Sequence, residues 1–220
     1  MDSGHESMGR VPSREEMRAA LVKRQGESLV SAFERSTVAI CGLGGLGSAI
    51  ALSLARAGVG RLILIDFDRL DVTNLHRQQY LACQVGRPKA EALTENLRQV
   101  APYVEYVPHV ARVTEENAPT LLAGASVVCE AFDVAEAKAM LAETVLTRLP
   151  EAYLVTGTGM AGIGPGNRIV TRRVGRRMYV CGDGESDVAE AGSLVAPRVM
   201  LCAAHQALVT LRLLAGQTDV

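Results

Sequence analysis

Neither sign of charge is in excess in this sequence. Its 220 residues contain 23 lysines and arginines and 24 aspartates and glutamates, which leaves a formal net charge of -1. Proteins that bind DNA or RNA need surplus positive charge to neutralise phosphates, so we expect no nucleic-acid partner. A chain of this length fits one large domain, and we expect a flexible tail over residues 1–12 and a single domain over residues 13–220.

Cysteine pairs of the CxxC type are absent. The five cysteines are an odd number with irregular spacing, which argues against a disulfide framework and against a tetrathiolate zinc site. Cys41 and Cys129 lie within apolar runs, where a cysteine usually acts as a small buried hydrophobe. We therefore expect no zinc, and a reducing, cytoplasmic setting.

Long apolar runs are also missing. The N-terminal stretch MDSGHESMGRVPSREE has no apolar segment of the kind that a secretory signal contains. The most apolar segment, residues 199–214, carries His205, Gln206 and Arg212. It therefore predicts a packed helix and no contact with a membrane.

Short apolar runs alternate with helical patterns along most of the chain. Ser13 and Glu16 form a capping-box signature, which predicts a helix from Arg14 to about Arg24. Further helices are predicted at residues 27–34, 46–58, 88–100, 134–148 and 197–214, with a short one opened by Thr114. Strands are predicted at residues 37–41, 61–66, 104–107, 126–130 and 153–156.

This alternation predicts an α/β fold with a Rossmann-like, mostly parallel sheet covered by helices on both faces. The pattern changes after Thr156. RIVTRR and RRMYV flank Val174 and Gly175 in the manner of two antiparallel strands around a tight turn. We therefore expect a C-terminal antiparallel extension of the sheet.

A glycine-rich motif lies between the first predicted strand and the helix that follows it. In CGLGGLGS, Gly42, Gly44 and Gly47 satisfy GxGxxG, and Asp66 ends the next strand. Glycines let a phosphate approach the backbone N–H groups at a helix N-terminus, and the acidic residue can hold ribose hydroxyls. The motif predicts a nucleotide site and leaves NAD and ATP open; a turn that serves only close packing is the alternative.

The connection between Asp66 and Pro88 is much longer than the usual 2–6 residues, and long connections are commonly functional. It is rich in charged and amide side chains, notably Asp68, Asn74, Arg77 and Gln78, and the next helix opens with Lys89. Cations and amides suit a triphosphate, because the charge on its oxygens must be neutralised when a phosphate bond breaks. The alternative is a solvated loop with incidental charge.

Polar residues follow three of the predicted parallel strands. Gly42, Asp66 and the pair Glu130 and Asp133 each come directly after a strand, and ligands in open α/β sheets bind at the carboxyl ends of strands. We expect these residues to converge. Asp133 is then placed to bind a magnesium ion that bridges phosphate oxygens, although it is also suited to cap the helix at residues 134–148.

These motifs together resemble a known family. GLGGLGS, LILIDFD, NLHRQ and VGRPKAEAL with Lys89, followed by Asp133, occur in the order seen in ThiF, MoeB and HesA proteins and in the adenylation domain of ubiquitin-activating enzymes. The resemblance spans roughly residues 20–215. The short length, the ending GDGESD…APRVMLCAAHQA and the missing zinc cysteines are most similar to the compact ThiF subfamily linked to thiamine biosynthesis.

The resemblance implies an adenylyltransferase that binds ATP and magnesium and activates the C-terminal glycine carboxylate of a ubiquitin-like sulfur carrier, similar to ThiS. It implies that Gly45 and its neighbours line the phosphates, that Asp66 binds the ribose, and that Asp133 organises magnesium. The remaining implied triphosphate contacts and catalytic cations are Asp68, Asn74, Gln78, Arg77 and Lys89. The glycine-rich stretch at residues 157–166 suits an extended Gly-Gly tail.

Partners follow from the same resemblance. It implies a homodimer, and a separate sulfur donor protein because no rhodanese domain is attached. An N-terminal arginine often reaches the partner's ATP in this family, and Arg14, Arg18 and Arg24 are the candidates. The usual Asp-x-x-Asp-Asn pattern is replaced by one that starts with Glu130 and retains Asp133, so the role of Glu130 stays open.

Cys181 is a further candidate, because some relatives hold the carrier on a cysteine in this region. It precedes a Gly-Asp-Gly turn that predicts a position near the surface, with Arg176 and Arg177 close enough to lower the pKa of its thiol. We favour the alternative, a small apolar residue that ends a strand. For the whole protein the alternatives are an NAD-dependent oxidoreductase, a non-catalytic scaffold, and a relative that adenylates a small-molecule or tRNA-linked carboxylate.

Overall fold

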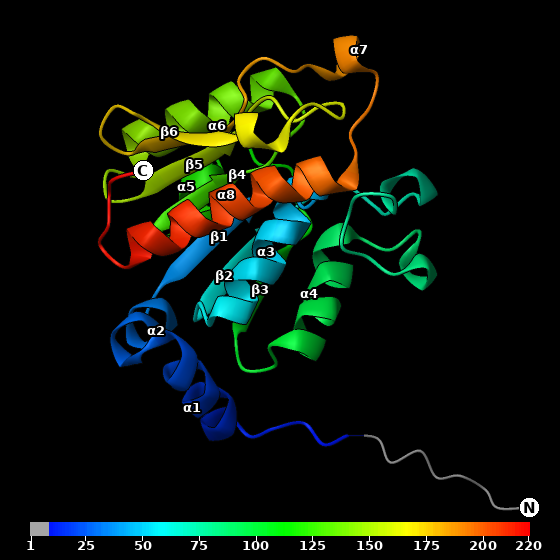
Figure 1. The fold of residues 1–220 in the computed structure, drawn as a ribbon. Coiled ribbons are helices and arrows are strands. Elements are labelled where there is room, and N and C mark those ends of the chain that lie inside the picture. The colour runs from blue at the N-terminus through cyan, green and yellow to red at the C-terminus, as the bar shows by residue number, and fades with distance from the viewer. Residues whose placement is uncertain (1–8) are drawn as a thin grey trace, which may run out of the picture.

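The computed structural model describes residues 9–220, so the first eight residues of the expected tail lie outside the described part. A single seven-stranded sheet runs through the molecule in the order β3-β2-β1-β4-β5-β7-β6 (Figure 1). The strands are β1 Thr37–Cys41, β2 Arg61–Ile65, β3 Glu105–His109, β4 Val127–Glu130, β5 Tyr153–Gly157, β6 Val170–Val174 and β7 Met178–Gly182.

Most of the sheet is parallel, as the sequence predicts. Strand β1 pairs in parallel with β2 on one side and with β4 on the other, and β5 pairs in parallel with β7. Strands β6 and β7 form the predicted antiparallel hairpin, with Gly175 at φ +67° in its turn. Because β1, β2 and β4 are neighbours, the residues that follow them meet at one edge of the sheet.

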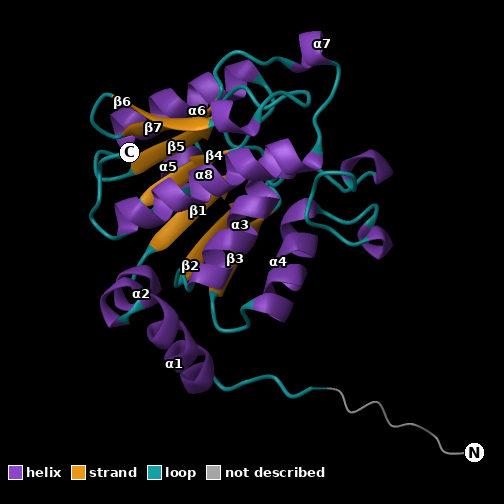
Figure 2. Ribbon diagram, viewed as in Figure 1, coloured by secondary structure: helices purple, strands orange, loops and turns teal. Residues whose placement is uncertain are grey.

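Helices cover both faces (Figure 2). One face carries α3 Gly45–Ala57, α4 Lys89–Val100 and α8 Ala196–Leu214, and the other carries α5 Ala118–Leu121 and α6 Ala135–Arg148. Alternation along β1 explains this, since Val38 and Ile40 pack under α3 and α8 while Ala39 and Cys41 pack with α5 and α6. Both faces of β1 are buried, so its sequence is an unbroken apolar run.

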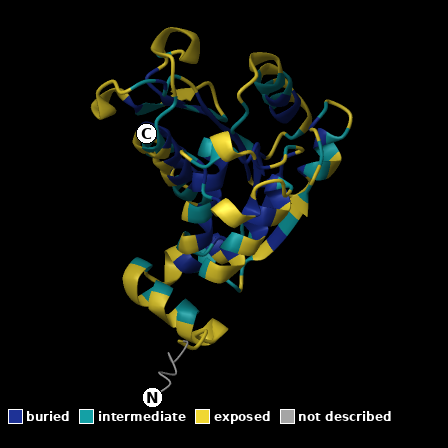
Figure 3. Ribbon diagram, turned by 90° about the vertical axis from the view of Figure 1, so that its right-hand side faces the viewer, coloured by how far each residue is buried: buried dark blue, intermediate teal, exposed yellow. Residues whose placement is uncertain are grey.

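Two helices precede the sheet. In α1 (Arg14–Gln25) the predicted capping box is present: the Ser13 hydroxyl accepts from the Glu16 N–H and the Glu16 carboxylate accepts from the Ser13 N–H. The second helix, α2 (Glu27–Glu34), buries Val30 and Phe33, whereas α1 buries none of its residues (Figure 3). Both helices lie at the amino-terminal end of the strands, opposite the long 66–88 segment (Figure 1).

The structure differs from the sequence predictions in one helix boundary and in one additional helix. Helix α5 begins at Ala118 rather than just after Thr114, because Thr114 and Asn117 exchange hydrogen bonds of 2.8 and 3.3 Å in a turn before it. The short helix α7, Val188–Ala191, is not predicted by the sequence. Within residues 9–220, none of the helices is long and apolar enough to cross a membrane.

Candidate functional site

The glycine motif forms the turn between β1 and α3. Gly42 has φ +88°, and a Cβ at this position would lie 2.7 Å from the Ala131 carbonyl oxygen. A Cβ on Gly47 would overlap the Gly42 carbonyl oxygen. Glycine is therefore required at both positions, by backbone conformation at the first and by the close approach of two turns at the second.

The N-terminus of α3 is open. Its N-cap residue is Gly44, and no side chain of the described residues caps the helix. A Cβ on Gly45 would lie 2.8 Å from Val199 Cγ1 and 3.4 Å from Arg77 Cγ, so the backbone here is approached closely by two side chains. The first N–H groups of an α-helix have no partner within the helix, and an uncapped, glycine-lined helix start fits a phosphate group.

Asp66 lies beside this turn. Its Oδ2 accepts from the Leu43 N–H at 2.7 Å and its Oδ1 accepts from the Asp68 N–H at 2.8 Å. Burial raises the pKa of the Asp66 carboxyl, while the Lys89 ammonium and the two backbone N–H groups oppose that rise. Each carboxylate oxygen has a second lone pair, so this fixed carboxylate can also accept from ribose hydroxyls.

The 66–88 segment packs onto the glycine turn. The Tyr80 hydroxyl donates to the Leu43 carbonyl oxygen at 2.7 Å, and the Gln79 N–H donates to the Ser48 hydroxyl at 3.1 Å. Gln78 is buried, and its Nε2 lies 3.7 Å from where a Cβ on Gly44 would be. Its Oε1 has no hydrogen-bond partner within the described part of the chain. The part of this segment at Gln78, Gln79 and Tyr80 is therefore packed against the glycine turn.

Arg77 of this segment and Lys89 at the start of α4 differ in how they are held. The aliphatic stem of Arg77 lies over Gly45, and its Nη1 is 2.6 Å from His76 Nε2 and 3.3 Å from the Thr73 carbonyl oxygen. The Lys89 side chain is only 8% exposed, and its Nζ is 2.8 Å from Asp68 Oδ2. The stem of Arg77 therefore borders the glycine turn, whereas the charge of Lys89 lies near Asp68 and Asp66.

Asn74 lies in a 3₁₀ turn, Val72–Asn74, rather than directly on the glycine turn. Its Oδ1 accepts from the Asp71 N–H at 3.0 Å, and Asp71 Oδ1 accepts from the Thr73 N–H at 2.8 Å. The Asn74 amide thus already stabilises the turn that precedes Arg77. Its direct contact with a triphosphate stays a prediction.

The residues after β4 include one clear correction. Helix α6 begins at Ala135 with Val134 as its N-cap residue and has no side-chain cap, so the prediction that Asp133 caps it is wrong. The Asp133 side chain is exposed. Glu130, which the sequence left without a role, is 1% exposed, and its Oε2 is 2.7 Å from Lys138 Nζ.

The fit to magnesium rests on this exposed carboxylate. Among residues 9–220 no three His, Cys, Asp or Glu side chains come together in a way that would hold a metal by protein ligands alone. Magnesium at a nucleotide site typically needs only one or two carboxylates, because phosphate oxygens and water complete its coordination. Asp133, beside the turn that meets Gly42, supplies that kind of ligand; the expectation of no zinc stays a prediction.

A cleft of about 650 Å³ lies between the glycine-rich stretch after β5 and the connection from β7 to α8. The Arg198 guanidinium and the Asp183 carboxylate, each 5% exposed, form an ion pair in its wall. Arg198 also donates to the carbonyl oxygens of Gly164 and Pro165, so it anchors the glycine-rich stretch to α8. Both residues lie in the ending GDGESD…APRVMLCAAHQA, but the sequence alone does not predict that they pair.

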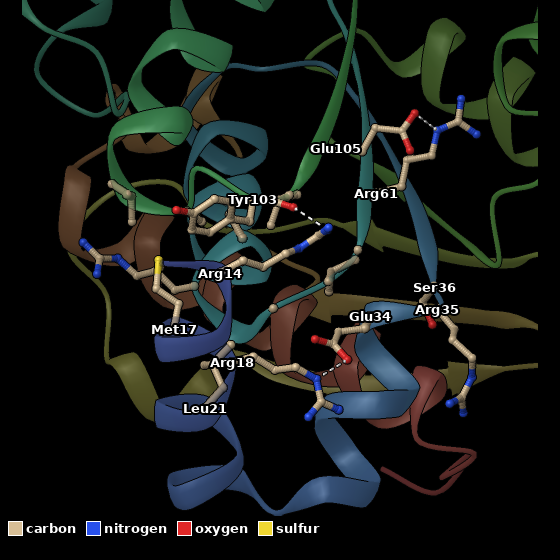
Figure 4. A pocket seen from close by; sticks show the side chains of 18 of the residues that line it. Arg14, Met17, Arg18, Leu21, Glu34, Arg35, Ser36, Arg61, Tyr103 and Glu105 are labelled. Atoms are coloured by element: carbon tan, nitrogen blue, oxygen red, sulfur yellow. Dashed lines mark hydrogen bonds and ion pairs between the residues drawn. The ribbon is translucent and has the colours of Figure 1, made fainter. Parts of the chain in front are cut away.

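A larger cleft, of about 910 Å³, lies at the opposite end of the sheet, between α1 and the turns before β2 and β3 (Figure 4). All three candidate N-terminal arginines, Arg14, Arg18 and Arg24, line it. Arg14 points to the Tyr103 carbonyl oxygen at 3.4 Å and Arg18 to Glu34 at 3.1 Å (Figure 4). Within one chain, these arginines therefore lie away from the glycine turn.

Cys181 is buried in β7, so the prediction that it lies near the surface is wrong. The turn follows the strand, but the side chain points into the core beside the Thr171 hydroxyl, 3.5 Å away. Burial raises the pKa of the Cys181 thiol to about 11. The expected help from Arg177 is also absent, since its guanidinium donates to the carbonyl oxygens of Leu146, Leu149 and Ala152 at the end of α6.

A strand, a glycine turn and an uncapped helix, with an acidic residue after the neighbouring strand, define a Rossmann-like nucleotide-binding protein. A family model described as the ThiF family matches residues 17–220. The molybdopterin-synthase adenylyltransferase of Salmonella typhimurium is 32% identical over 191 residues, which are 84% of this chain and 75% of that protein. This chain therefore belongs to the ThiF family.

Other similarities differ in extent. The adenylyltransferase and sulfurtransferase uba4 of Aspergillus terreus is 40% identical over 110 residues, but these are 50% of this chain and only 23% of that protein. Among solved structures, the Escherichia coli tRNA N6-threonylcarbamoyladenosine dehydratase TcdA in complex with ATP has a TM-score of 0.81 and 25% identity. That similarity covers 94% of this chain and 98% of the other.

Proposed function

We propose that this protein is an adenylyltransferase that uses ATP to activate a carboxylate and releases pyrophosphate. Membership of the ThiF family supports this proposal, as does the name of the Salmonella relative. The observation that carries it is the open N-terminus of α3, where Arg77 lies over Gly45 while Lys89 and Asp66 lie at the same edge of the sheet. A reaction that transfers a nucleotide needs this concentration of donors more than hydride transfer does.

Each residue of the site has a proposed role that follows from its position. The N–H groups at the start of α3 receive phosphate oxygens, and Asp66 accepts from the ribose. Arg77 and Lys89 offset the charge that builds up as pyrophosphate leaves, and Gln78 contributes its amide from the side wall. A magnesium ion bound by Asp133 and the phosphates would neutralise further charge.

The nucleophile is the substrate's own carboxylate. An ionised carboxylate oxygen attacks the α-phosphorus, the bond from that phosphorus to the bridging oxygen of pyrophosphate breaks, and an acyl-adenylate forms. A terminal carboxylate is ionised at neutral pH, so no general base is required. The protein's contribution is orientation and charge stabilisation.

The substrate we favour is the C-terminal glycine of a ubiquitin-like sulfur carrier of the ThiS type, in thiamine thiazole synthesis, with a separate protein as sulfur donor. The cleft of about 650 Å³ supports an extended tail, because Gly162 and Gly164 line it without side chains. The buried Arg198–Asp183 pair would keep this wall fixed while the tail enters.

A second candidate substrate is a carboxylate carried by tRNA. The similarity to the TcdA dehydratase covers nearly all of both chains and favours this candidate. The balanced net charge of this chain argues against it, since an RNA-bound substrate calls for a basic surface.

We further propose a homodimer. Met200, Ala204 and Leu208 form an exposed stripe at four-residue spacing along α8, with Met200 47% and Leu208 61% exposed. An uncharged stripe of this kind on a helix face is typical of a surface that packs against another chain.

Exchange of labelled pyrophosphate into ATP tests the proposed function. We expect exchange that requires magnesium and a carrier ending in Gly-Gly, with no response to NAD. Omitting the carrier, or truncating its last glycine, is the matched control. Micromolar NAD binding with no ATP binding, measured by calorimetry, would contradict the proposal; exchange stimulated by modified tRNA and by no carrier would favour the second candidate.

A further inference from the structure

A closed set of contacts surrounds the backbone of Phe132, the residue just before Asp133. Glu130 ends β4 and is 1% exposed. Its Oε1 accepts from the Phe132 N–H at 2.7 Å, and its Oε2 accepts from the Thr156 hydroxyl on β5. The same carboxylate is paired with Lys138 of α6, whose Nζ lies 2.7 Å from Oε2.

Lys138 closes the set from the other side. Its Nζ donates to the Phe132 carbonyl oxygen at 3.2 Å, in addition to its ion pair with Glu130. The backbone N–H and C=O of Phe132 are therefore both held by side chains, one by Glu130 and one by Lys138. We call Glu130, Lys138 and Thr156 the Phe132 clamp.

The clamp fixes the connection between β4 and α6 against the glycine turn. The Ala131 N–H donates to the Cys41 carbonyl oxygen at 2.8 Å, and the Ala131 carbonyl oxygen lies where a Cβ on Gly42 would be only 2.7 Å away. Helix α6 has no side-chain cap that would hold this connection by itself. A shift of the Phe132 peptide would therefore move Asp133 relative to the phosphate site.

We propose that Glu130, Lys138 and Thr156 are positioning residues, which hold the exposed Asp133 carboxylate where a magnesium ion on the triphosphate can reach it. This inference rests on the proposed function for the role of Asp133. It assigns a purpose to Glu130, which departs from the aspartate usual at its position, and to Lys138 and Thr156, which no sequence motif marks. Residues that orient a metal ligand typically change metal affinity or activity 10–100-fold when they are replaced.

Lys138→Met is the principal variant, because it removes both contacts of the ammonium group. Arg148→Met is its matched control: Arg148 lies on the same helix and is also paired with a glutamate, Glu115, but far from the glycine turn. Lys138→Met leaves the buried Glu130 carboxylate without its cation, which is destabilising. The double variant Glu130→Gln/Lys138→Met removes both charges and keeps the test valid if the single variant fails to fold.

The first readout is independent of activity. Hydrogen exchange of the Phe132 amide should be at least about tenfold faster in Lys138→Met, or in the double variant, than in Arg148→Met, because local opening of the clamp exposes this N–H to solvent. Exchange in the strands should stay unchanged. Equal protection of Phe132 in the clamp variants and the control would overturn the inference.

The second readout is the magnesium dependence of pyrophosphate exchange. We expect the half-saturating magnesium concentration to rise about tenfold in Lys138→Met while the KM for ATP changes little, and Lys138→Arg to restore most of the loss. A lower thermal midpoint with unchanged magnesium dependence would mean that the ion pair is structural only, and the inference would fail. If the wild-type protein supports no exchange at all, the proposed function fails together with the role in magnesium binding, whatever the Phe132 amide shows.

Discussion

The two ends of the sheet hold charge in different ways. At the amino-terminal end, the larger cleft lies under α1, a helix that buries none of its residues, and lining arginines such as Arg18 and Arg61 are paired with glutamates. At the carboxyl end, Lys89 is nearly buried, and within residues 9–220 no side chain caps the start of α3 and no group bonds to the buried Gln78 oxygen. The amino-terminal end therefore has the larger cleft, whereas the carboxyl end has backbone and side-chain groups that are fixed in place and available for hydrogen bonds to a ligand.

Under the function that we propose, the larger cleft is not the nucleotide site, so cleft size is a poor guide to it. A loosely attached helix leaves space because few side chains fill it, and paired charges at its rim have little left to offer a ligand. A backbone turn held by hydrogen bonds from Asp66 and Tyr80 keeps its N–H groups in place before any ligand arrives. Preorganised donors of this kind lose little freedom when they bind.

The sharpest test compares one glycine at each end of the sheet. A Cβ on Gly47 would overlap the Gly42 carbonyl oxygen, and a Cβ on Gly60 would overlap the Glu34 carbonyl oxygen. Gly47→Ala and Gly60→Ala should each lower the free energy of unfolding by about 1–3 kcal/mol, as overpacking does. Only Gly47→Ala should abolish ATP binding, because it distorts the turn at the carboxyl end. Calorimetry with ATP and thermal unfolding decide this; loss of ATP binding in Gly60→Ala as well would break the comparison.

The cations at the carboxyl end give the next largest effect. Arg77→Ala and Lys89→Ala should each slow pyrophosphate exchange by about a hundredfold, the usual cost of removing one preorganised charge contact. Arg61→Ala, at the amino-terminal end, is the control and should leave the rate nearly unchanged, because its partner Glu105 is largely exposed. Wild-type rates in both Arg77→Ala and Lys89→Ala would contradict their assignment.

Asp133→Asn should have a smaller effect. The amide keeps the shape but lowers the charge available to magnesium, so we expect exchange at low magnesium to fall about tenfold and to recover in part at high magnesium. Thermal stability should not change, since Asp133 is exposed and caps no helix. A variant with full activity at ordinary magnesium would show that Asp133 has no part in the site.

The smallest effect is expected for Cys181→Ser. Acyl-adenylate formation needs ATP, magnesium and a carboxylate, and the buried thiol, whose pKa burial raises to about 11, is a poor nucleophile. Mass spectrometry of the carrier should show the adenylate in both the wild type and the variant. Loss of the adenylate, with the fold intact, would show that Cys181 takes part in the reaction.

The sequence predicts those features that depend on nearby residues. The capping box at Ser13, the apolar run of β1 and the hairpin turn at Gly175 each have a local cause, and each is confirmed. The parallel pairing of the strands follows from the same alternation. The glycine turn and Asp66 also lie together as predicted, because neighbouring parallel strands end at a common edge.

Features that depend on distant residues were missed or misjudged. Tyr80 donates a hydrogen bond to the Leu43 carbonyl oxygen, and Lys138 forms an ion pair with Glu130. Both contacts exist only in the folded chain. Asp133 has the residue type of a cap, but Val134 takes the N-cap position of α6. Cys181 precedes a turn yet faces the core, since alternation along β7 decides its direction.

Val199 of α8 packs against Gly45 at the start of α3. Strands β2 to β7 all lie between these two residues in the sequence. A contact between residues this far apart costs more loop-closure entropy than a local contact does. The wall that Val199 adds to the glycine turn cannot form before α8 has been made. A growing chain that has not yet made α8 should carry the nucleotide motif and still be unable to retain ATP.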